Sequence, residues 1–248
     1  MQTDFLETIL SARTDTDVQH HFLETLDHLG FSHGLYAARF MLSLPDSISR
    51  EDYYCFGNFP APFMDAIESR QLLASSHWMT WSHQQTGSAP CQQIDAELTT
   101  ECARLADRHG LNSGYVLSLR NQIPDVHGMV VVTPHAHASP IKSRRLWEIA
   151  GGRIRMLSTL LHFRMATLRR NRRAQSLTRR QREVLEWSAT GKTVSETAVI
   201  LGVSAATVEK HLRLARAAMS AGNTAQAILK AYVTDQLFTT SSDKYDKR

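Results

Sequence analysis

The 248-residue sequence predicts an α+β protein of two domains: an N-terminal α-β-α sandwich with a largely antiparallel sheet, and a C-terminal all-α domain of four helices. A change in net charge indicates the division. Residues 1–163 carry 12 Lys and Arg against 17 Asp and Glu, net −5, whereas residues 164–248 carry 16 against 7, net +9. Strand and hairpin patterns precede this change, and four helix starts follow it.

Helical and extended patterns are mixed in the first domain, so we expect helices on both faces of the sheet. A turn at Pro124-Asp125 joins two extended segments as a hairpin. Gly151 and Gly152 predict a weak point or kink in the last helix. Extended patterns cover residues 31–40, 53–56, 115–119 and 129–133, and helical patterns cover residues 6–11, 18–29, 95–109 and 140–168.

Two capping boxes open the second domain. The side chains of Thr178 and Thr193 can each accept a hydrogen bond from a free backbone amide at a helix start. Gln181 and Glu196 stand three residues further on and can reach back to the caps. This reciprocal pattern predicts a helix after each threonine.

Glycines end these two helices, and a third helix begins almost at once. Gly191 follows the first helix, Gly202 follows the second, and Ser204 is the next N-cap, which leaves a two-residue turn. Apolar residues at helical spacing predict the buried side of each helix. They are Val184, Leu185 and Ala189 in the first, Ala198, Ile200 and Leu201 in the second, and Val208, Leu212, Ala215 and Met219 in the third.

Small, cationic and hydrogen-bonding residues occupy the opposite side of the third helix. Arg213 can offer two parallel hydrogen bonds to guanine, and Glu209 can accept one from a cytosine amine. Thr207 and Lys210 can reach phosphates or base edges. A solvated helix can carry such a face too, but three capped helices in this order favour DNA binding. The face comprises Ala206, Glu209, Lys210 and Arg213, flanked by Thr207, His211 and Arg216.

These residues resemble the LuxR-type helix-turn-helix signature, over residues 177–185, 191–193, 196–198, 200–201 and 207–211. The resemblance implies a four-helix DNA-binding domain in which Lys192 contacts phosphate and Glu209 and Arg213 face bases. Thr197 replaces the family's usual isoleucine, and Glu209 stands where a basic or amide residue is common, so the preferred base sequence is expected to differ. The predicted DNA-contacting residues are Lys192, Thr193, Ala206, Thr207, Glu209, Lys210, Arg213 and Arg216.

A last helix is predicted from Asn223, a good N-cap, to Leu237. Its apolar surface is wider than one interface needs. One side can close the domain while the other meets a second copy, as the resemblance also implies, which would place two recognition helices about one duplex turn apart on a partly palindromic site. The alternative is that the whole surface is buried within one domain.

Domain bounds follow from these patterns. The sequence predicts a sensor and dimerisation domain over residues 1–163, a basic linker over 164–176, a DNA-binding domain over 177–238 and a disordered tail over 239–248. The linker's arginines either contact phosphates beside the bound site or are simply solvated. They are Arg164, Arg169, Arg170, Arg172 and Arg173.

Aromatic residues between positions 53 and 81 mark where an apolar ligand could lie between the sheet and its helices, although such residues also form ordinary cores. The LuxR-type resemblance extends to this region. Asn58-Phe59-Pro60 looks like the family's Asn-Tyr-Pro turn, and Gly110 and Ser113-Gly114 look like its later glycine region. The resemblance therefore implies an autoinducer-binding domain.

The polar groups between these motifs depart from the family. Counted from Asn58, Phe63 replaces a tryptophan, Ile67 a tyrosine, and Ser76-His77 the Asp-Pro whose carboxylate accepts the amide hydrogen of an acyl-homoserine lactone. Each buried polar group left unpaired costs about 1–3 kcal/mol. We therefore expect ligand independence or a non-standard, small apolar signal molecule. Candidate ligand residues are Tyr53, Phe56, Phe59, Phe63, Ile67, Ser76, Trp78, Trp81 and Gly114.

Enzyme and metal signatures are missing. The sequence has no Gly-x-Ser-x-Gly elbow, no phosphate-binding glycine loop and no His-Glu-x-x-His, so we expect no enzyme and no cofactor. His127, His135 and His137, and the pair His20-His21, are local concentrations without matching Cys or carboxylate partners, so no metal is expected.

Cysteine usage and hydropathy indicate a cytoplasmic protein. Cys55, Cys91 and Cys102 are odd in number and widely spaced, which fits reduced thiols. There is no apolar run of membrane length and no basic-then-apolar leader, so no membrane partner is expected.

The leading hypothesis is a sequence-specific transcriptional regulator of the LuxR quorum-sensing type. It acts as a homodimer on a partly palindromic operator in double-stranded DNA, without a ligand or with a non-standard one. Alternatives are an acyl-homoserine-lactone-responsive regulator, an antagonist that pairs with another LuxR-type regulator, and a hydrolase of signal molecules. Lys192, Lys210 and Arg213 argue against an antagonist, which needs no groove-reading face, and the missing nucleophile motif argues against a hydrolase.

Overall fold

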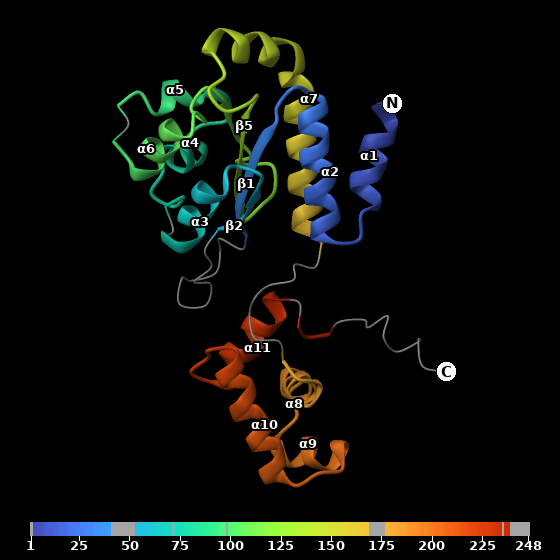
Figure 1. Ribbon diagram of the computed structural model, residues 1–248. Helices are drawn as coiled ribbons and strands as arrows, with labels where there is room; N and C mark the ends of the chain where they lie inside the picture. The colour runs from blue at the N-terminus through green and yellow to red at the C-terminus, as the bar shows by residue number, and fades with distance from the viewer. Residues whose placement is uncertain are drawn as a thin grey trace. The chain divides into compact units, whose positions relative to one another are not determined.

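The computed structural model describes residues 2–40, 53–70, 72–97, 99–168, 177–234 and 236–238. The described residues form two compact units, one ending at Leu168 and the other following it (Figure 1). The first unit is α+β with an antiparallel sheet, and the second is all-α with four helices. The predicted fold class is confirmed.

A five-stranded sheet forms the middle layer of the first unit, in the order β2-β1-β5-β4-β3. Each neighbouring pair of strands is antiparallel. The longest pairing joins all eight residues of β1 to all eight of β5. The strands are β1 (His33–Phe40), β2 (Tyr54–Gly57), β3 (Gly87–Pro90), β4 (Tyr115–Ser118) and β5 (Val126–Thr133).

Helices cover both faces of this sheet and bury a separate apolar cluster on each (Figure 1). On one face lie α2 (Asp15–His28) and α7 (Pro140–Thr167), with α1 (Gln2–Ser11) outside them. The other face is covered by α3 (Ala61–Arg70), α4 (His77–Gln84), α5 (Cys91–Ile94) and α6 (Glu101–Arg108). We call the first cluster the α7-side core and the second the α4-side core.

Sequence patterns located most of these elements but not all of their bounds. The helix predicted over 95–109 is shorter, because Thr100 is the N-cap of α6 and residues 95–97, 99 and 100 are not helical. The predicted hairpin is present, and Asp125 adopts a φ of +56 in the turn that precedes β5. Sequence analysis did not predict α3, α4 or β3. These elements are short and lack a sustained period.

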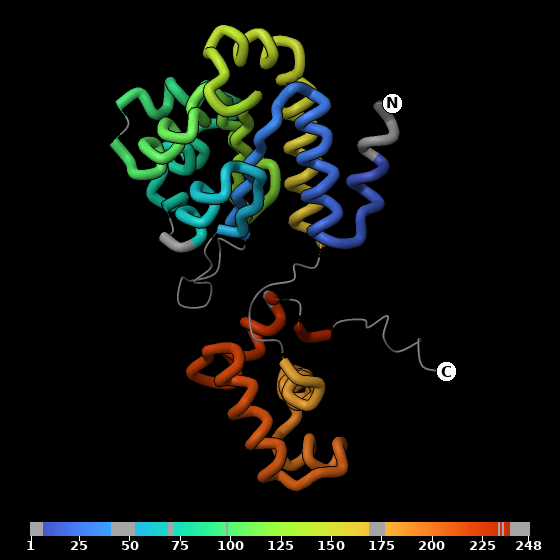
Figure 2. Tube along the Cα trace, in the orientation of Figure 1, coloured from blue at the N-terminus to red at the C-terminus, as the bar shows by residue number. Residues whose placement is uncertain are grey.

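The long helix α7 is hydrogen-bonded continuously through Gly151 and Gly152. Its tube nevertheless consists of two arms that meet at a bend (Figure 2). Successive glycines offer little resistance to such bending. The helix runs to Thr167 and Leu168 is buried, so the domain boundary placed at 163 from the charge change falls inside α7.

One buried histidine lies in the α7-side core. His162 on α7 is fully buried, and its Nδ1 lies 3.0 Å from the hydroxyl of Tyr36. Its ring also stacks on Phe40. Burial lowers the pKa of His162 to about 4, so the imidazole is neutral at physiological pH and fits an apolar core.

The second unit contains the four predicted helices: α8 (Arg179–Ala189), α9 (Val194–Leu201), α10 (Ala205–Ala218) and α11 (Thr224–Val233). Both capping boxes form, at Thr178 and Thr193. The predicted burial of Val208, Leu212, Ala215 and Met219 is confirmed.

Three details of this unit differ from the predictions. Ala189 is exposed because it is the last residue of α8. Ile200 is 44% exposed, and the buried side of α9 is formed by Thr197 and Ala198 instead. Helix α11 ends at Val233, although Leu237 beyond it is buried in the same core. Amphipathic periodicity therefore predicted the buried residues of the long helix α10 better than those of the eight-residue α9.

Replacing either of two threonines in the α9 region by valine should change stability, in opposite directions. Thr197 is fully buried and its hydroxyl has no hydrogen-bond partner among the described residues, so Thr197→Val should raise the free energy of unfolding by about 1 kcal/mol or more. Thr193→Val makes the same chemical change but removes an N-cap, so it should lower the free energy of unfolding by about 1 kcal/mol. Urea unfolding of the full chain, followed by circular dichroism, measures both. A loss of stability in Thr197→Val would contradict this account.

Candidate DNA interface and sensor core

Helix α10 is positioned by the turn that precedes it. Gly202 ends α9 in the left-handed region, with a φ of +64, and Ser204 caps α10 by accepting a hydrogen bond from the amide of Thr207. Gly202 and Val203 separate α9 from the N-cap Ser204, which is the predicted two-residue turn. The buried stripe of α10 packs on the rest of the unit, so the opposite face of the helix is held toward solvent.

The exposed face of α10 contains the central residues of the predicted groove-reading set. Ala206, Glu209, Lys210 and Arg213 are all exposed. Within the described part of the chain, the side chains of Lys210 and Arg213 make no hydrogen bond or ion pair. Arg179 and Arg180 on α8, by contrast, are both paired with Glu183. The side chains of Lys210 and Arg213 are therefore available to an external anionic partner.

The flanks of this face are engaged within the unit. The hydroxyl of Thr207 lies 2.8 Å from that of Ser204, the N-cap. Arg216 donates to the hydroxyl of Thr224 on α11 at 3.1 Å, so its guanidinium joins the two helices. Arg216 was predicted to contact DNA, and this bond gives it a structural contact that sequence analysis did not foresee.

Another cation, Lys192, lies just before the start of α9. Lys192 is exposed and follows Gly191, which has a φ of +84. Thr193 and Glu196 next to it are bonded to each other in the capping box, and these bonds lower the pKa of the Glu196 carboxyl. Thr193 thus acts as a cap in this structure, while the ammonium of Lys192 extends from a helix N-terminus, where an anion is also favoured.

Most of the predicted ligand residues do gather on one face of the sheet. Tyr53, Phe59, Phe63, Ile67, Trp78 and Trp81 all belong to, or pack on, the α4-side core. Phe56 does not: it lies in the α7-side core against Phe22 and Tyr36. The prediction that Phe56 joins the other aromatics is wrong, because side chains alternate along β2 and Phe56 points to the opposite face from Tyr53 and Cys55.

Ser76 uses its hydroxyl within its own helix start. It caps α4 by accepting from the amide of Met79 at 3.1 Å, and it donates to the carbonyl of Leu73 at 2.7 Å. The side chain is 1% exposed. A hydroxyl with both partners supplied by the backbone has little capacity left for a ligand, so Ser76 is a structural residue here.

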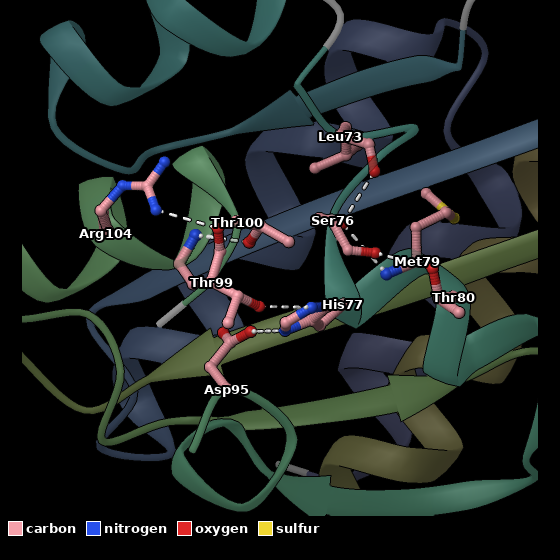
Figure 3. A network of polar contacts seen from close by, with 10 residues as sticks. Leu73, Ser76, His77, Met79, Thr80, Asp95, Thr99, Thr100 and Arg104 are labelled. Atoms are coloured by element: carbon pink, nitrogen blue, oxygen red, sulfur yellow. Dashed lines mark hydrogen bonds and ion pairs between the residues drawn. The ribbon is translucent and has the colours of Figure 1, made fainter. Parts of the chain in front are cut away.

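The polar network around Ser76 continues to His77 and Asp95 (Figure 3). His77 Nδ1 lies 3.1 Å from Asp95 Oδ1, and its Nε2 lies 3.1 Å from the hydroxyl of Thr99. Burial raises the pKa of the Asp95 carboxyl, and His77 opposes that change. Sequence analysis missed Asp95, because eighteen residues separate it from its partner. These contacts tie α4 to the segment between α5 and α6.

The two motifs that resemble family turns have structural roles. Asn58 accepts from the amide of Gly34 at 2.8 Å and donates to the carbonyl of Ser32 at 2.8 Å, which fastens the end of β2 to the start of β1. A Cβ on Gly114 would lie 2.1 Å from the carbonyl oxygen of Val132, so only glycine fits between β4 and β5.

The remaining titratable residues form no metal site among the residues that the structure describes. His127 lies beside His83, His135 lies near Lys142, and His137 packs against Gly110. Burial raises the pKa of the thiols of Cys55 and Cys102 to about 12, so both are protonated and unreactive at physiological pH. None of the described helices is both long and apolar enough to cross a bilayer.

Comparison with known proteins matches both units to families. Residues 14–165 match the model of the autoinducer binding domain, and residues 175–231 match that of bacterial regulatory proteins of the luxR family. The activator SolR of Ralstonia solanacearum is 27% identical over 94% of this chain and 99% of its own length. The quorum sensing-dependent regulator RpaR of Rhodopseudomonas palustris is 38% identical over 73% of this chain and 68% of its own length. The fold also matches SdiA, solved in complex with octanoyl-rac-glycerol, with a TM-score of 0.52 and 20% identity over 94% of this chain and 93% of that one.

An autoinducer-binding-type domain followed by a helix-turn-helix domain defines a class of DNA-binding transcriptional regulators. The chain belongs to the LuxR family and is a transcriptional regulator of the quorum-sensing type. It is not an enzyme, since its relatives are regulators. The predicted resemblance to this family is confirmed over both units.

Proposed function

We propose that this regulator binds a partly palindromic operator as a homodimer in the cytoplasm, and that it needs no acyl-homoserine lactone to do so. The observation that carries the proposal is the exposed face of α10, on which Lys210 and Arg213 have no partner within the described residues. Arg213 reads a base edge, Lys192 and Lys210 contact phosphates, and Glu209 modifies the base preference. Ala206 allows close approach to the groove floor.

The dimer is supported by an unpartnered apolar stripe on α7. Met156 and Phe163 are 53% and 46% exposed and stand seven residues apart after the bend of α7, with Thr159 between them on the same face. Ile149, 74% exposed, precedes Gly151 and Gly152, where the helix bends, and extends the apolar surface there. Exposed apolar residues at a seven-residue spacing fit a helix seam between two copies, and the same patch on both partners satisfies twofold symmetry. The opposite side of α7 is buried in the α7-side core.

Helix α11 offers a second contact between copies. Ala227 and Ala231 are buried in its own unit, whereas Tyr232 is 62% exposed and Leu229 is half-buried. This exposure supports the use of the outer side of α11 as a contact between copies. In the proposed dimer, the outer side pairs with its counterpart and fixes the separation of the two recognition helices.

Lactone independence is supported by the chemistry of the α4-side core. The positions that hold polar ligand groups in the family carry Phe63, Ile67 and Ser76 here, and the Ser76 hydroxyl is already bonded to backbone on both sides. A buried lactone amide would find no carboxylate at position 76, and the nearby Asp95 carboxylate is already bonded to His77. An amide left unpaired costs about 1–3 kcal/mol. If a signal is bound, an apolar molecule of another class fits better, and SdiA provides an example of this fold with an acyl glycerol.

Operator selection tests the proposal directly. Full-length protein from a host that makes no acyl-homoserine lactone is offered random duplexes alone, with added lactones, or with extract of the native organism. We expect a palindromic site to be enriched without any addition, or only with extract if a non-standard signal is needed. Enrichment only with added lactone would overturn lactone independence, and enrichment of no site in any arm would overturn the proposed DNA recognition.

Substitutions in the recognition face should separate base reading from phosphate contact. Arg213→Ala should cost about 1–3 kcal/mol of binding free energy on the selected operator and relax preference at one base position. Lys192→Ala should weaken binding to all duplexes alike and reduce the salt slope by about one. Arg179→Ala is the matched control, because that arginine is already paired with Glu183 on α8. Fluorescence anisotropy at several salt concentrations measures all three. Unchanged specificity in Arg213→Ala would show that another face reads the DNA.

A charge placed in the α7 stripe should break the dimer. Phe163→Asp puts a carboxylate into the proposed apolar seam, so we expect a monomer by light scattering and an operator affinity reduced by at least tenfold, about 1.4 kcal/mol. Val199→Asp is the control, because Val199 is 83% exposed on α9 and outside the stripe. The dimer proposal fails if both variants have the same mass as the unaltered protein and that mass is a dimer's.

A further inference from the structure

A second polar cluster lies at one end of the α4-side core, away from the Ser76 network. Arg39 on β1 stands directly opposite His127 on β5 in the strand pair. Side chains alternate along a strand, so Arg39 and His127 lie on the same face of the sheet as the other odd-numbered residues of β1 and β5. Those residues, Leu35, Ala37, Met129 and Val131, belong to the α4-side core. The strand pairing therefore places a guanidinium and an imidazole side by side under α4.

Three further groups converge on this pair. The ring of His83 on α4 lies 4.8 Å from that of His127, centroid to centroid. The hydroxyl of Tyr53 lies 3.4 Å from His83 Nε2. Arg120 donates to the carbonyl of Gln84 at 2.9 Å, which holds its guanidinium next to the end of α4. Five segments thus contribute to one cluster of cations and hydrogen-bond donors: β1, β5, α4, the residue before β2 and the segment after β4.

Among the described residues, every charged group in this cluster is positive. Burial lowers the pKa of His83, and the positive charges of His127, Arg39 and Arg120 lower it further. Burial and Arg120 likewise lower the pKa of His127. Among the described residues, no carboxylate is one of the charges acting on either imidazole. His127 Nδ1 is buried and has no hydrogen-bond partner in the part of the chain that the structure describes.

We propose that Tyr53, His83, His127 and Arg120, with Arg39 beside them, bind an oxyanion: the carboxylate or phosphoryl end of a small molecule. The guanidinium of Arg120 supplies charge, the Tyr53 hydroxyl donates a hydrogen bond, and the imidazoles supply N–H donors. An anion relieves the mutual repulsion of the cations and gives the buried nitrogen of His127 a partner. This site is separate from the DNA-reading face, so its test is independent of the proposed function.

The binding should be coupled to protonation. In the free protein both imidazoles have a lowered pKa and are largely neutral at pH 7. An anion within a few ångströms favours the protonated form and should raise the pKa of each ring. By linkage, a ligand that raises a pKa binds more tightly as the pH falls, so affinity should increase from pH 8 to pH 6.

Nuclear magnetic resonance of the histidine rings in the full-length protein tests the site. Spectra are recorded against pH at constant ionic strength in chloride, acetate and sulfate, with His83→Gln and His127→Gln for assignment. Sulfate stands in for a phosphoryl group because its charge is constant over this range. We expect a saturable rise in the pKa of both rings with at least one oxyanion and none with chloride. A rise with acetate alone identifies a carboxylate site, and a rise with sulfate alone identifies a phosphoryl site.

Matched variants distinguish binding from a structural role. Arg120→Gln should weaken the anion's affinity by about tenfold or more, the loss expected for a charged hydrogen bond. Arg108→Gln removes the same charge from an exposed position on α6 and should have no effect. Tyr53→Phe keeps the ring and should weaken binding several-fold, which preserves the test if Arg120→Gln does not fold. Equal pKa values in all three salts, or equal affinity in the Arg120 and Arg108 variants, would overturn the proposal.

Discussion

The pairing of β1 with β5 is the constraint on which the N-terminal unit depends. In this eight-residue register, Tyr36 stands opposite Val130 and both enter the α7-side core, while Leu35 and Val131 enter the α4-side core. A slip of one residue would exchange the two faces of β1 and carry Arg39 into the α7-side core, where the charge would be buried. The register is therefore fixed by the cost of burying a cation as well as by apolar packing.

This alternation explains which parts of the sensor core could be predicted from the sequence. The aromatic-rich segment after position 53 was correctly placed in the first domain's interior, because apolar composition requires burial. Its division between two cores was not predicted, although the extended pattern over residues 53–56 already places Tyr53 and Phe56 on opposite faces of a strand. The cluster around His83 and His127 was missed for a different reason: its members are joined by strand pairing and helix packing over long sequence separations.

The DNA-binding unit was more predictable because its determinants are local. A capping box involves residues three positions apart, and a left-handed glycine ends a helix through its own backbone. The helix starts at Thr178, Thr193 and Ser204 follow from such signals. Contacts between helices do not: the bond from Arg216 to Thr224 and the burial of Thr197 depend on how α9, α10 and α11 pack. Sequence analysis thus placed the exposed face of α10 correctly and did not foresee the contacts that Thr207 and Arg216 make within the unit.

Dimer formation is the step at which a signal can control the DNA binding of such a regulator. One copy of α10 offers few cations and a short reading face, whereas two copies bound together double the phosphate contacts without a second loss of translational freedom. A signal can act on DNA binding only if its affinity differs between the monomer and the dimer, or between two forms of the dimer. The proposed seam belongs to α7, whose opposite side, with His162 and Leu161, packs in the α7-side core. A change in the packing of that core can therefore alter the pitch or bend of α7 and so the fit of its stripe. Under the proposed lactone independence, the intrinsic stability of the proposed seam sets the fraction of the regulator that can bind its operator.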